Sequence, residues 1–264
     1  MTRFVAVGDL MVDVAAEGKG HEARITLVAG GSALNAACTA AALGADAAVA
    51  GRVGDDDGGR LLLAHLAARG VRADVEVDGA APTGTVLVVD GEVRAERGAN
   101  AQYAPQHLPE LEADAVLVSG HLREALVAAA LSRAQAAWVA LDLARVAAPP
   151  AEATIVLANE AAARRVTGLG AEDAVCRLAE GRRLACVTLG GAGAVAAWDG
   201  RVRWAAAPAT GSRADVAGAG DAFAAALLCQ LAGGATVPEA LEFACDAGAT
   251  VARSGRAAAA YEAR

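Results

Sequence analysis

Short Val-rich segments alternate with longer Ala- and Leu-rich segments along most of the chain. This alternation is typical of βα units, in which helices connect the strands of a mostly parallel sheet. The predicted strands are Phe4–Val7, Ala47–Gly51, Ala115–Ser119, Trp138–Leu141, Thr154–Leu157 and Leu184–Leu189. The predicted helices are Ala33–Leu43, Arg60–Arg69, Arg123–Ala136, Glu160–Val166, Asp173–Ala179, Ala222–Ala232 and Val237–Arg253. We therefore expect one α/β domain over residues 1–264, with a three-layer, mostly parallel sheet flanked by helices.

Two segments, Val12–Val28 and Ala73–Arg97, break this rhythm because they contain alternating runs with no helix between them. Asp90-Gly91 lies between two such runs and is a strong signal for a tight hairpin. We expect the two segments to form a small antiparallel β lid over the carboxyl ends of the main strands, where open α/β sheets bind ligands. Such a lid would exclude water from an activated group. The alternative is a surface hairpin with no gating role.

Composition narrows the possible functions. The hydrophobic fraction is 55% with only 3% aromatic residues, so the core must consist mainly of Ala, Val and Leu. The net charge of -8 disfavours a broad surface for nucleic acid or anionic membranes. The five cysteines are widely spaced in apolar stretches, which argues against a disulfide framework or a zinc site and fits a reducing cytoplasm. We see no signal-peptide pattern and no membrane-length apolar stretch, and expect a cytoplasmic protein.

The segment Asp215–Phe223 combines small residues with one carboxylate. Gly218, Ala219 and Gly220 let backbone N–H groups approach an anion, at the start of a predicted helix whose N-terminus attracts negative charge. Asp221 would lie in the first helical turn, where we expect it to be ionised near neutral pH and able to accept a hydroxyl proton. These are the requirements for phosphoryl transfer to an alcohol. The alternative is a Gly-rich turn capped by an aspartate.

Five further motifs follow in a fixed order along the chain. They are Gly30-Gly31-Ser-Ala-Leu-Asn35, Gly51-Arg-Val-Gly-Asp-Asp-Asp-Gly58, Gly98-Ala-Asn-Ala101, Asn159-Glu160 followed by Thr167-Gly168, and Val187-Thr-Leu-Gly-Gly-Ala-Gly193. With Asp215–Phe223, they make the chain resemble the ribokinase-like sugar kinases over nearly its whole length. The resemblance implies a ribokinase-like fold and an ATP-dependent carbohydrate kinase. It also implies that Asp221 is the catalytic base and that Gly218, Ala219 and Gly220 form the anion hole.

The resemblance also implies a binding site for the acceptor. Asp13, Gly31 and Asn35 match positions that bind the hydroxyls of the sugar, and the loop containing Asn100 is also expected to face the substrate. A carboxylate and an amide can pair with vicinal hydroxyls, while a glycine pair lets the ring approach the backbone. From the residues alone, Asp13 could equally be an exposed charge at a strand end and Asn35 an amide on a helix surface.

For the nucleotide, the resemblance implies that Thr188, Gly190 and Gly193 belong to the phosphate loop and that Asn159 belongs to the magnesium and phosphate motif. A Mg²⁺ ion is expected because this acidic chain cannot otherwise neutralise the phosphates. Asp215 could help to bind K⁺ or another monovalent cation, with carbonyls from around Arg253 to Gly255, or it could be a loop cap. A homodimer through the lid is expected because unpaired strand edges invite pairing.

The chain departs from the family pattern at three places. Ala162 stands where a Glu is common, three residues after the matched Asn159, which puts magnesium affinity in question. Met11 replaces a common Asn in the first substrate loop, which suggests an acceptor other than ribose. Val216-Ala217 replaces a Thr-rich approach to the anion hole, although backbone donors survive such changes.

Motifs for other nucleotide-binding enzymes match the sequence poorly. Gly191-Ala-Gly193 is a poor match to a nicotinamide-binding Rossmann motif, and the chain has no Walker phosphate loop. The main alternatives are a catalytically silent sugar- or nucleotide-binding regulatory protein of the same fold, and a nucleoside kinase. The four histidines, His21, His65, His107 and His121, have no metal-ligand spacing, but His121 follows a strand and could line the substrate pocket. The expected partner is a small sugar or sugar-like molecule.

Overall fold

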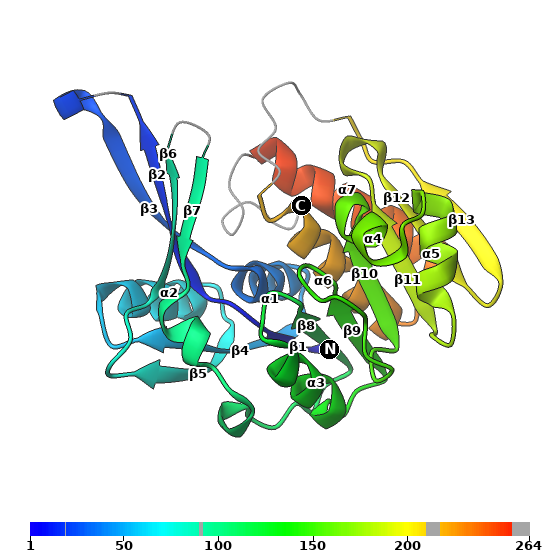
Figure 1. Ribbon diagram of the computed structural model, residues 1–264, viewed down its shortest axis with the longest axis horizontal. Helices are drawn as coiled ribbons and strands as arrows, with labels where there is room; N and C mark the ends of the chain where they lie inside the picture. The colour runs from blue at the N-terminus through cyan, green and yellow to red at the C-terminus, as the bar shows by residue number, and fades with distance from the viewer. Residues whose placement is uncertain (19, 90–91, 210–216, 255–264) are drawn as a thin grey trace.

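The computed structural model describes residues 1–18, 20–89, 92–209 and 217–254. Its main sheet has the strand order β13-β12-β11-β10-β9-β8-β1-β4-β5 (Figure 1). All pairings from β5 to β11 are parallel, whereas β12 and β13 join antiparallel at one edge. The strands are β1 (Arg3–Val7), β4 (Asp46–Gly54), β5 (Arg72–Asp78), β8 (Ala115–Ser119), β9 (Trp138–Asp142), β10 (Ile155–Asn159), β11 (Leu184–Thr188), β12 (Ala194–Trp198) and β13 (Arg201–Ala205).

Helices cover both faces of this sheet, because its strands are apolar on both sides. In β1, Phe4 and Ala6 point into one core, and Val5 and Val7 point into the other. The first face carries α1 (Ser32–Ala42), α2 (Asp57–Ala68), α6 (Ala219–Ala232) and α7 (Val237–Ser254). The second face carries α3 (Glu124–Arg133), α4 (Glu160–Thr167) and α5 (Ala171–Ala179). The predicted three-layer α/β architecture is confirmed. No helix in the described part of the chain is long and apolar enough to span a membrane.

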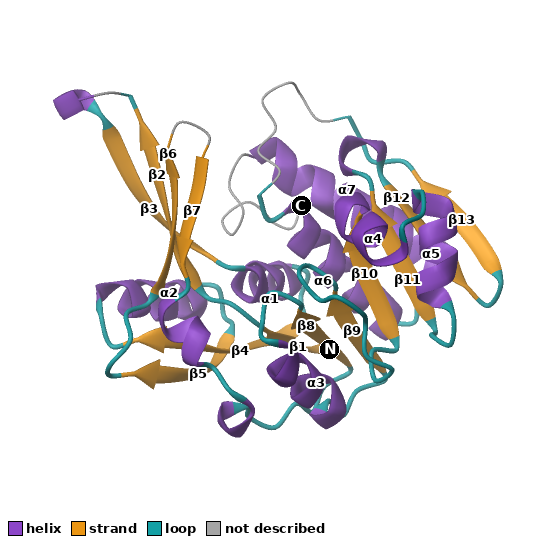
Figure 2. Ribbon diagram, in the orientation of Figure 1, coloured by secondary structure: helices purple, strands orange, loops and turns teal. Residues whose placement is uncertain are grey.

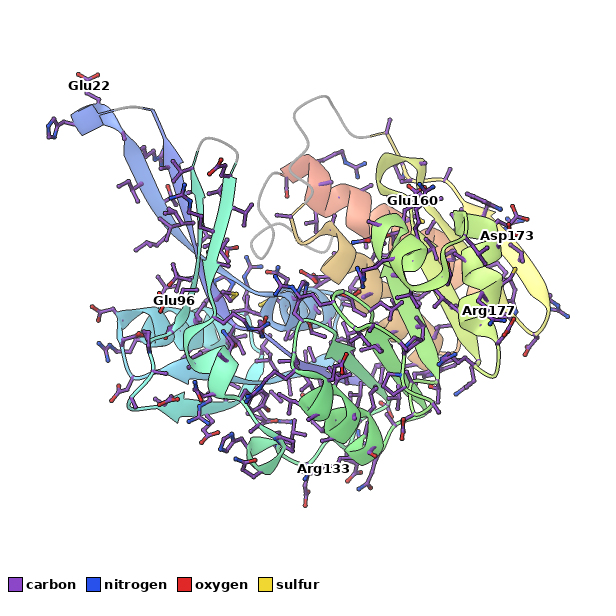
Figure 3. The ribbon with its side chains drawn as sticks, viewed as in Figure 1. Glu22, Glu96, Arg133, Glu160, Asp173 and Arg177 are labelled. Carbon is purple, nitrogen blue, oxygen red and sulfur yellow. The ribbon has the colours of Figure 1, made fainter. Side chains whose placement is uncertain are left out.

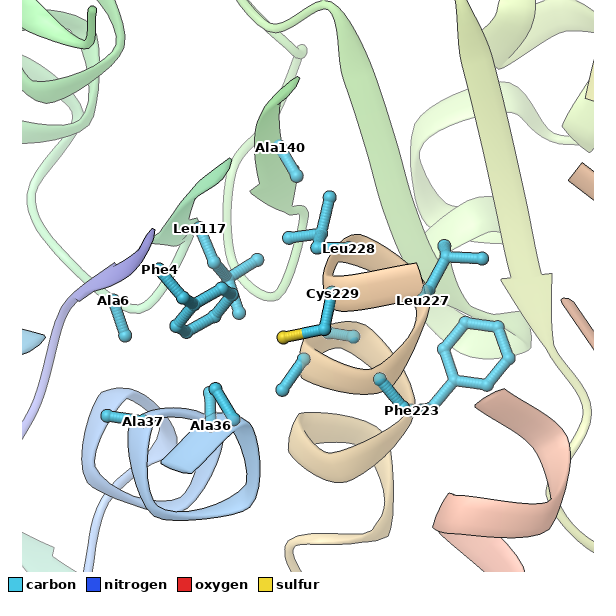
Figure 4. Close-up of a cluster of buried hydrophobic side chains, with 14 of the residues drawn as sticks. Phe4, Ala6, Ala36, Ala37, Leu117, Ala140, Phe223, Leu227, Leu228 and Cys229 are labelled. Atoms are coloured by element: carbon cyan, nitrogen blue, oxygen red, sulfur yellow. The ribbon is translucent and has the colours of Figure 1, made fainter. Parts of the chain in front are cut away.

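Small side chains set the spacing of the first core. Figure 4 shows Ala36 and Ala37 of α1 facing the same cluster as Leu228 and Cys229 of α6, with Phe4 and Leu117 on the strands beneath. Alanines let the two helices approach each other and the sheet closely, and the few aromatic rings fill the remaining volume. This packing fixes the first turn of α6 relative to α1, which matters for the site described below.

A second sheet stands away from the main body beside α1 and α2 (Figure 2). Its strand order is β3 (Arg24–Gly30), β2 (Met11–Glu17), β6 (Gly84–Val89) and β7 (Glu92–Glu96). The two outer pairings are antiparallel and the central β2–β6 pairing is parallel. Val89 pairs with Glu92, as the predicted hairpin requires, while its turn Asp90-Gly91 lies outside the described residues. We call this small sheet the lid.

The boundary predicted for the second lid segment, Ala73–Arg97, is wrong at its start. Residues 73–78 belong to β5, which pairs with β4 at the edge of the main sheet, and the lid strand begins only at Gly84. An edge strand alternates apolar and polar residues in the same way as a lid strand. The alternation therefore identified a strand but could not assign it to a sheet.

Candidate active site

The residues predicted to form the anion hole lie at the beginning of α6. Gly218 has a φ of 75°, the left-handed conformation that favours glycine, and the helix starts at Ala219. The first helical hydrogen bond is donated by Ala222 N to Gly218 O at 2.9 Å. The N–H groups of residues 219 to 221 therefore have no acceptor within the helix and are available to an anion.

Asp221 is the third residue of α6, and it meets the side chain of Asn35 from α1. Asn35 Nδ2 donates to Asp221 Oδ2 at 2.9 Å. Asn35 is 6% exposed, so it is not the helix-surface amide that the sequence left open. Its Oδ1 atom is buried without a hydrogen-bond partner among the described residues. An unpartnered buried acceptor next to a carboxylate fits a hydroxyl group of a ligand.

The pKa of Asp221 is raised to about 7, chiefly by burial and also by the negative charges of Asp142 and Asp13, against the opposing effect of the Asn35 hydrogen bond. Asp221 was expected to be ionised near neutral pH because of the positive helix end, and this expectation is corrected. Desolvation outweighs the helix, because a buried carboxylate loses the water that stabilises its charge. Near neutral pH the group is divided between its two forms, which suits a general base.

Asp13 and Gly31 lie on the same side of the site as Asn35. A Cβ atom at Gly30 would lie 2.2 Å from Asp13 Oδ2, so the Asp13 side chain packs directly against the glycine pair. Gly31 has a φ of 101°, and a Cβ there would lie 2.3 Å from Asp9 O. The start of α1 thus touches the loop between β1 and β2. The structure brings Asp13, Gly31 and Asn35 together near Asp221.

Asn100 does not face this site as predicted. Its side chain is 3% exposed, and both of its polar atoms bind the backbone of Leu10. Leu10 N donates to Asn100 Oδ1 at 3.1 Å, and Asn100 Nδ2 donates to Leu10 O at 2.8 Å. Asn100 therefore fixes the loop that leads into β2, the strand that carries Asp13.

Three polar residues that were not predicted as site residues lie beside Asp221. Ser32, Ser119 and Asp142 line a void of about 10 Å³ together with Asp221. Ser32 Oγ and Ser119 Oγ are 2.9 Å apart, and Asp142 is the register partner of Ser119 at the carboxyl end of β9. Burial raises the pKa of Asp142. A polar residue directly after the predicted strand Trp138–Leu141 was a usable signal, since ligands bind at the carboxyl ends of such strands.

A cavity of about 570 Å³ opens on the other side of the α6 N-terminus. It gathers residues that were predicted to bind the nucleotide and to form the anion hole, which are Asn159, Thr188, Gly190, Gly193, Ala219 and Gly220. Glu160 also lines it, at the start of α4 (Figure 3). Most of the other lining residues are small. The cavity is large enough for a nucleotide and ends at the turn that carries Asp221.

The predicted nucleotide residues differ in their local roles. Asn159 Oδ1 accepts a hydrogen bond from Ala162 N at 2.8 Å and so caps α4. Gly190 has a φ of 57° and open space around it. Gly193 has a φ of 104°, and a Cβ there would lie 2.0 Å from Ala205 O, so packing against β13 also requires glycine.

Gly248 of α7 also lines the cavity and was not predicted. A Cβ atom at this position would lie 3.0 Å from Ala219 O. The missing side chain lets α7 pack against the first turn of α6, where the anion hole is predicted. A glycine inside a predicted helix is the signal that could have identified it, because such a glycine often has a packing reason.

The structure describes the predicted magnesium motif at Asn159 but not Asp215, which was predicted to bind a monovalent cation. Among the described residues, no group of three or more His, Cys, Asp and Glu side chains is placed to hold a metal ion. Ala162 is 2% exposed and packs into the core, so no carboxylate extends from this position toward the cavity. Asp215 and Val216, and Gly255 beyond α7, lie outside the described residues.

The sequence of the whole chain, residues 1–264, matches the model of the pfkB family of carbohydrate kinases. The chain belongs to this family. A related protein is the bifunctional protein HldE of Caulobacter vibrioides, which is 33% identical over 253 residues, covering 84% of this chain and 51% of HldE. The chain thus spans about half the length of that relative.

Solved structures of similar fold include two sugar kinases and a nucleoside kinase. A fructokinase variant from Vibrio cholerae, bound to fructose, ADP and potassium, has a TM-score of 0.86 and 23% identity, covering 98% of this chain and 95% of that one. The Thermotoga maritima ribokinase has a TM-score of 0.83 and 21% identity, covering 97% and 96%. The Sinorhizobium meliloti adenosine kinase has a TM-score of 0.82 and 22% identity, covering 95% and 94%. At these identities the pfkB-family kinase shares their fold.

Proposed function

We propose that this ATP-dependent carbohydrate kinase transfers the γ-phosphoryl group of ATP to a hydroxyl of a small sugar or sugar-like molecule, with Asp221 as the base. The observation that carries the proposal is the position of Asp221. It binds Asn35 in the acceptor site, and the turn that carries it borders the 570 Å³ cavity. A base at this junction can reach a hydroxyl on one side while a phosphoryl group enters from the other.

The chemistry follows from the groups around this junction. Asp13, Gly31 and Asn35 orient the acceptor, and its reacting hydroxyl donates a hydrogen bond to ionised Asp221. Asp221 takes the proton as the hydroxyl oxygen attacks phosphorus, and the bond to the leaving ADP oxygen breaks. The N–H groups at the start of α6 stabilise the charge on the transferred phosphoryl oxygens.

The cavity fits ATP in size, and its glycines and alanines let a nucleotide contact the backbone. We propose that Thr188 and Gly190 hold its phosphates and that Gly193 supports their loop. Asn159 and Glu160 line the cavity and would hold a phosphate-bound Mg²⁺, which would need few protein ligands because it keeps its own water molecules. This ion would neutralise phosphate charge. The binding of K⁺ by Asp215 stays a prediction, because this residue lies outside the described part of the chain.

A second candidate is a silent sugar-binding or regulatory protein, and the buried Ala162 is the observation that favours it. A coupled assay of ADP release with MgATP decides between the two. It should use a panel of neutral sugars, sugar acids, sugar phosphates and nucleosides, with Asp221→Asn as the control. Turnover of one acceptor that the variant loses supports the kinase. Sugar binding without ADP release by the unaltered chain would support the silent protein.

The pH dependence of kcat/KM for the acceptor should report the environment of Asp221. Because its pKa is raised to about 7, the active ionised form is lost as pH falls through 7, and the rate should drop about tenfold per pH unit below that. Asp142→Asn removes a nearby negative charge that raises this pKa, so its acid limb should move to lower pH. An unshifted limb with intact folding would contradict the coupling between the two carboxyls.

We propose a homodimer through the lid, and the outer face of that sheet supports it. Val14, Ile25, Leu27 and Val89 lie on the face opposite Asp13, with Ile25 68% and Leu27 58% exposed. Exposed apolar patches of this kind mark association sites. Light scattering should give twice the chain mass, and Leu27→Lys should give the single-chain mass. A monomer at micromolar concentration in the unaltered protein would reject the proposal.

A further inference from the structure

Basic side chains gather at one end of the acceptor site, beyond the carboxyl ends of three neighbouring strands. His121 follows β8 and Arg145 follows β9. The acidic residue Asp9 follows β1, and these three strands are adjacent in the sheet. Arg97, at the end of the last lid strand, joins them. We call Arg97, His121 and Arg145 the cationic rim. None of its members lines the nucleotide cavity.

Arg97 is the fixed member of the rim. Its Nη2 atom lies 2.7 Å from Asp9 Oδ1, and its Nη1 donates to His121 O. Asp9 is 6% exposed, and burial raises its pKa against the charges of Arg97, His121 and Arg145. The ion pair leaves Asp9 compensated and holds the end of the lid against the loop after β8.

His121 and Arg145 differ from Arg97 because both are exposed and neither side chain makes a hydrogen bond within the described residues. Arg145 N donates to Gly120 O at 3.3 Å. Because Gly120 directly precedes His121, this bond brings Arg145 next to His121. The turn before Arg145 is strained, because Ala144 has a φ of 34°, and its N–H is held by the Asp142 carboxyl. A strained turn that persists at a site edge indicates a functional constraint.

The rim is connected to the proposed base through Ser119. His121 N donates to Ser119 Oγ at 3.3 Å, and Ser119 lines the small void beside Asp221. Ser119 Oγ is also 2.9 Å from Ser32 Oγ, at the start of α1 next to Gly31. The rim therefore lies near the end of the acceptor site that holds Asp221. Asp9 is already paired with Arg97, and the guanidinium of Arg145 makes no ion pair among the described residues.

We infer that the cationic rim binds an anionic substituent of the acceptor, a carboxylate or a phosphate. This inference rests on the proposed kinase function and narrows its acceptor to sugar acids or sugar monophosphates. Arg145 supplies the positive charge, His121 supplies an imidazole N–H group beside it, and Arg97 positions the loop that presents His121. A guanidinium suits both anions because its fork of N–H donors matches their paired oxygens.

The test compares neutral sugars with anionic compounds of related structure. ADP release should be measured with fructose, fructose 6-phosphate, glucose, gluconate, ribose and ribose 5-phosphate. We expect one anionic member to exceed its neutral partner by at least about tenfold in kcat/KM, as charge-assisted hydrogen bonds allow. Preference for gluconate identifies a carboxylate site and preference for a monophosphate identifies a phosphate site. Equal or better turnover of the neutral sugars overturns the inference and leaves the kinase proposal intact.

Arg145→Gln should lower kcat/KM for the anionic acceptor by about 10- to 100-fold and leave any neutral acceptor within about twofold. His121→Gln should have a smaller effect in the same direction. Arg177→Gln is the matched control, since Arg177 is an exposed, ion-paired arginine on the outer surface of α5, far from the lid (Figure 3). Equal kinetics for Arg145→Gln and the control would overturn the inference.

If no acceptor on the panel releases ADP, the kinase proposal fails for these compounds, and binding still tests the rim. Titration calorimetry with gluconate and with ribose 5-phosphate then compares the unaltered chain, Arg145→Gln and Arg177→Gln. Binding that Arg145→Gln alone weakens supports an anion site. Binding that Arg145→Gln leaves unchanged, or no binding of either anion at millimolar concentration, contradicts it.

Discussion

Asp221→Asn is expected to lower kcat by roughly 10²- to 10⁴-fold, the usual contribution of a positioned general base. The substituted amide has the same shape, and its oxygen can still accept the hydrogen bond from Asn35 Nδ2, so the acceptor site should keep its geometry. It cannot take the hydroxyl proton. ADP release measures the loss, and titration calorimetry should show acceptor affinity within a few-fold of the unaltered chain.

Asp173→Asn is a matched control because Asp173 is the third residue of α5, as Asp221 is the third residue of α6. Both carboxyls lie in the positive first turn of a helix, but Asp173 is on the outer surface (Figure 3). The control should retain full turnover. If Asp221→Asn keeps more than one tenth of kcat, Asp221 is not the base, and an equal loss in both variants would indicate an effect on helix stability instead.

The parallel strands could be predicted from the sequence because they are buried on both faces. β8 runs from Ala115 to Ser119, as predicted, since its apolar run ends at polar residues on both sides. Helix starts could also be predicted where a side chain fixes them. Asn159 caps α4, which begins at Glu160 as expected, and the order of layers followed from these elements.

The edges of the sheet were harder to predict, because edge strands have weaker patterns. β12 and β13 were not among the predicted strands, although the sequence Asp199-Gly200 between them is a signal for a tight hairpin. In the structure both residues have positive φ, as a two-residue hairpin requires. The same Asp-Gly signal had identified the hairpin of the lid. Alanine dominates β12, and its low strand propensity concealed the pattern.

Within the site, sequence identified the residues that one motif supplies but not those that distant elements bring to it. Asp221, Asn35 and Asp13 were predicted through the family resemblance, and the structure joins them. Asp142 lies beside Asp221, about 80 residues away in the sequence, and Gly248 contacts Ala219, about 30 residues away. A single sequence does not show which distant segments meet in the fold. The raised pKa of Asp221 has the same origin, since a helix start is visible in sequence but the burial around it is not.

Gly31→Ala is expected to cost both stability and acceptor binding. At a φ of 101° and a ψ of 141°, outside the left-handed helical region, any other residue is strained by roughly 1–3 kcal/mol. The new Cβ would also lie 2.3 Å from Asp9 O and 2.9 Å from Leu10 Cα, so the loop before β2 must move. That shift disturbs the Asn100 pairing with Leu10 and displaces Asp13. We expect an unfolding free energy roughly 3 kcal/mol lower and kcat/KM for the acceptor at least about 100-fold lower.

Gly44→Ala separates the two causes. Gly44 has a φ of 86°, and a Cβ there would meet nothing within 4 Å, so this variant carries backbone strain without a clash. Urea unfolding should show only about 1–2 kcal/mol of destabilisation for it, and its kinetics should be unchanged. If Gly31→Ala loses no more stability than Gly44→Ala and keeps its acceptor kinetics, the loop at Asp9 can move to accommodate the added Cβ atom without a measurable cost. The close approach of α1 to that loop would then not be what builds the acceptor site.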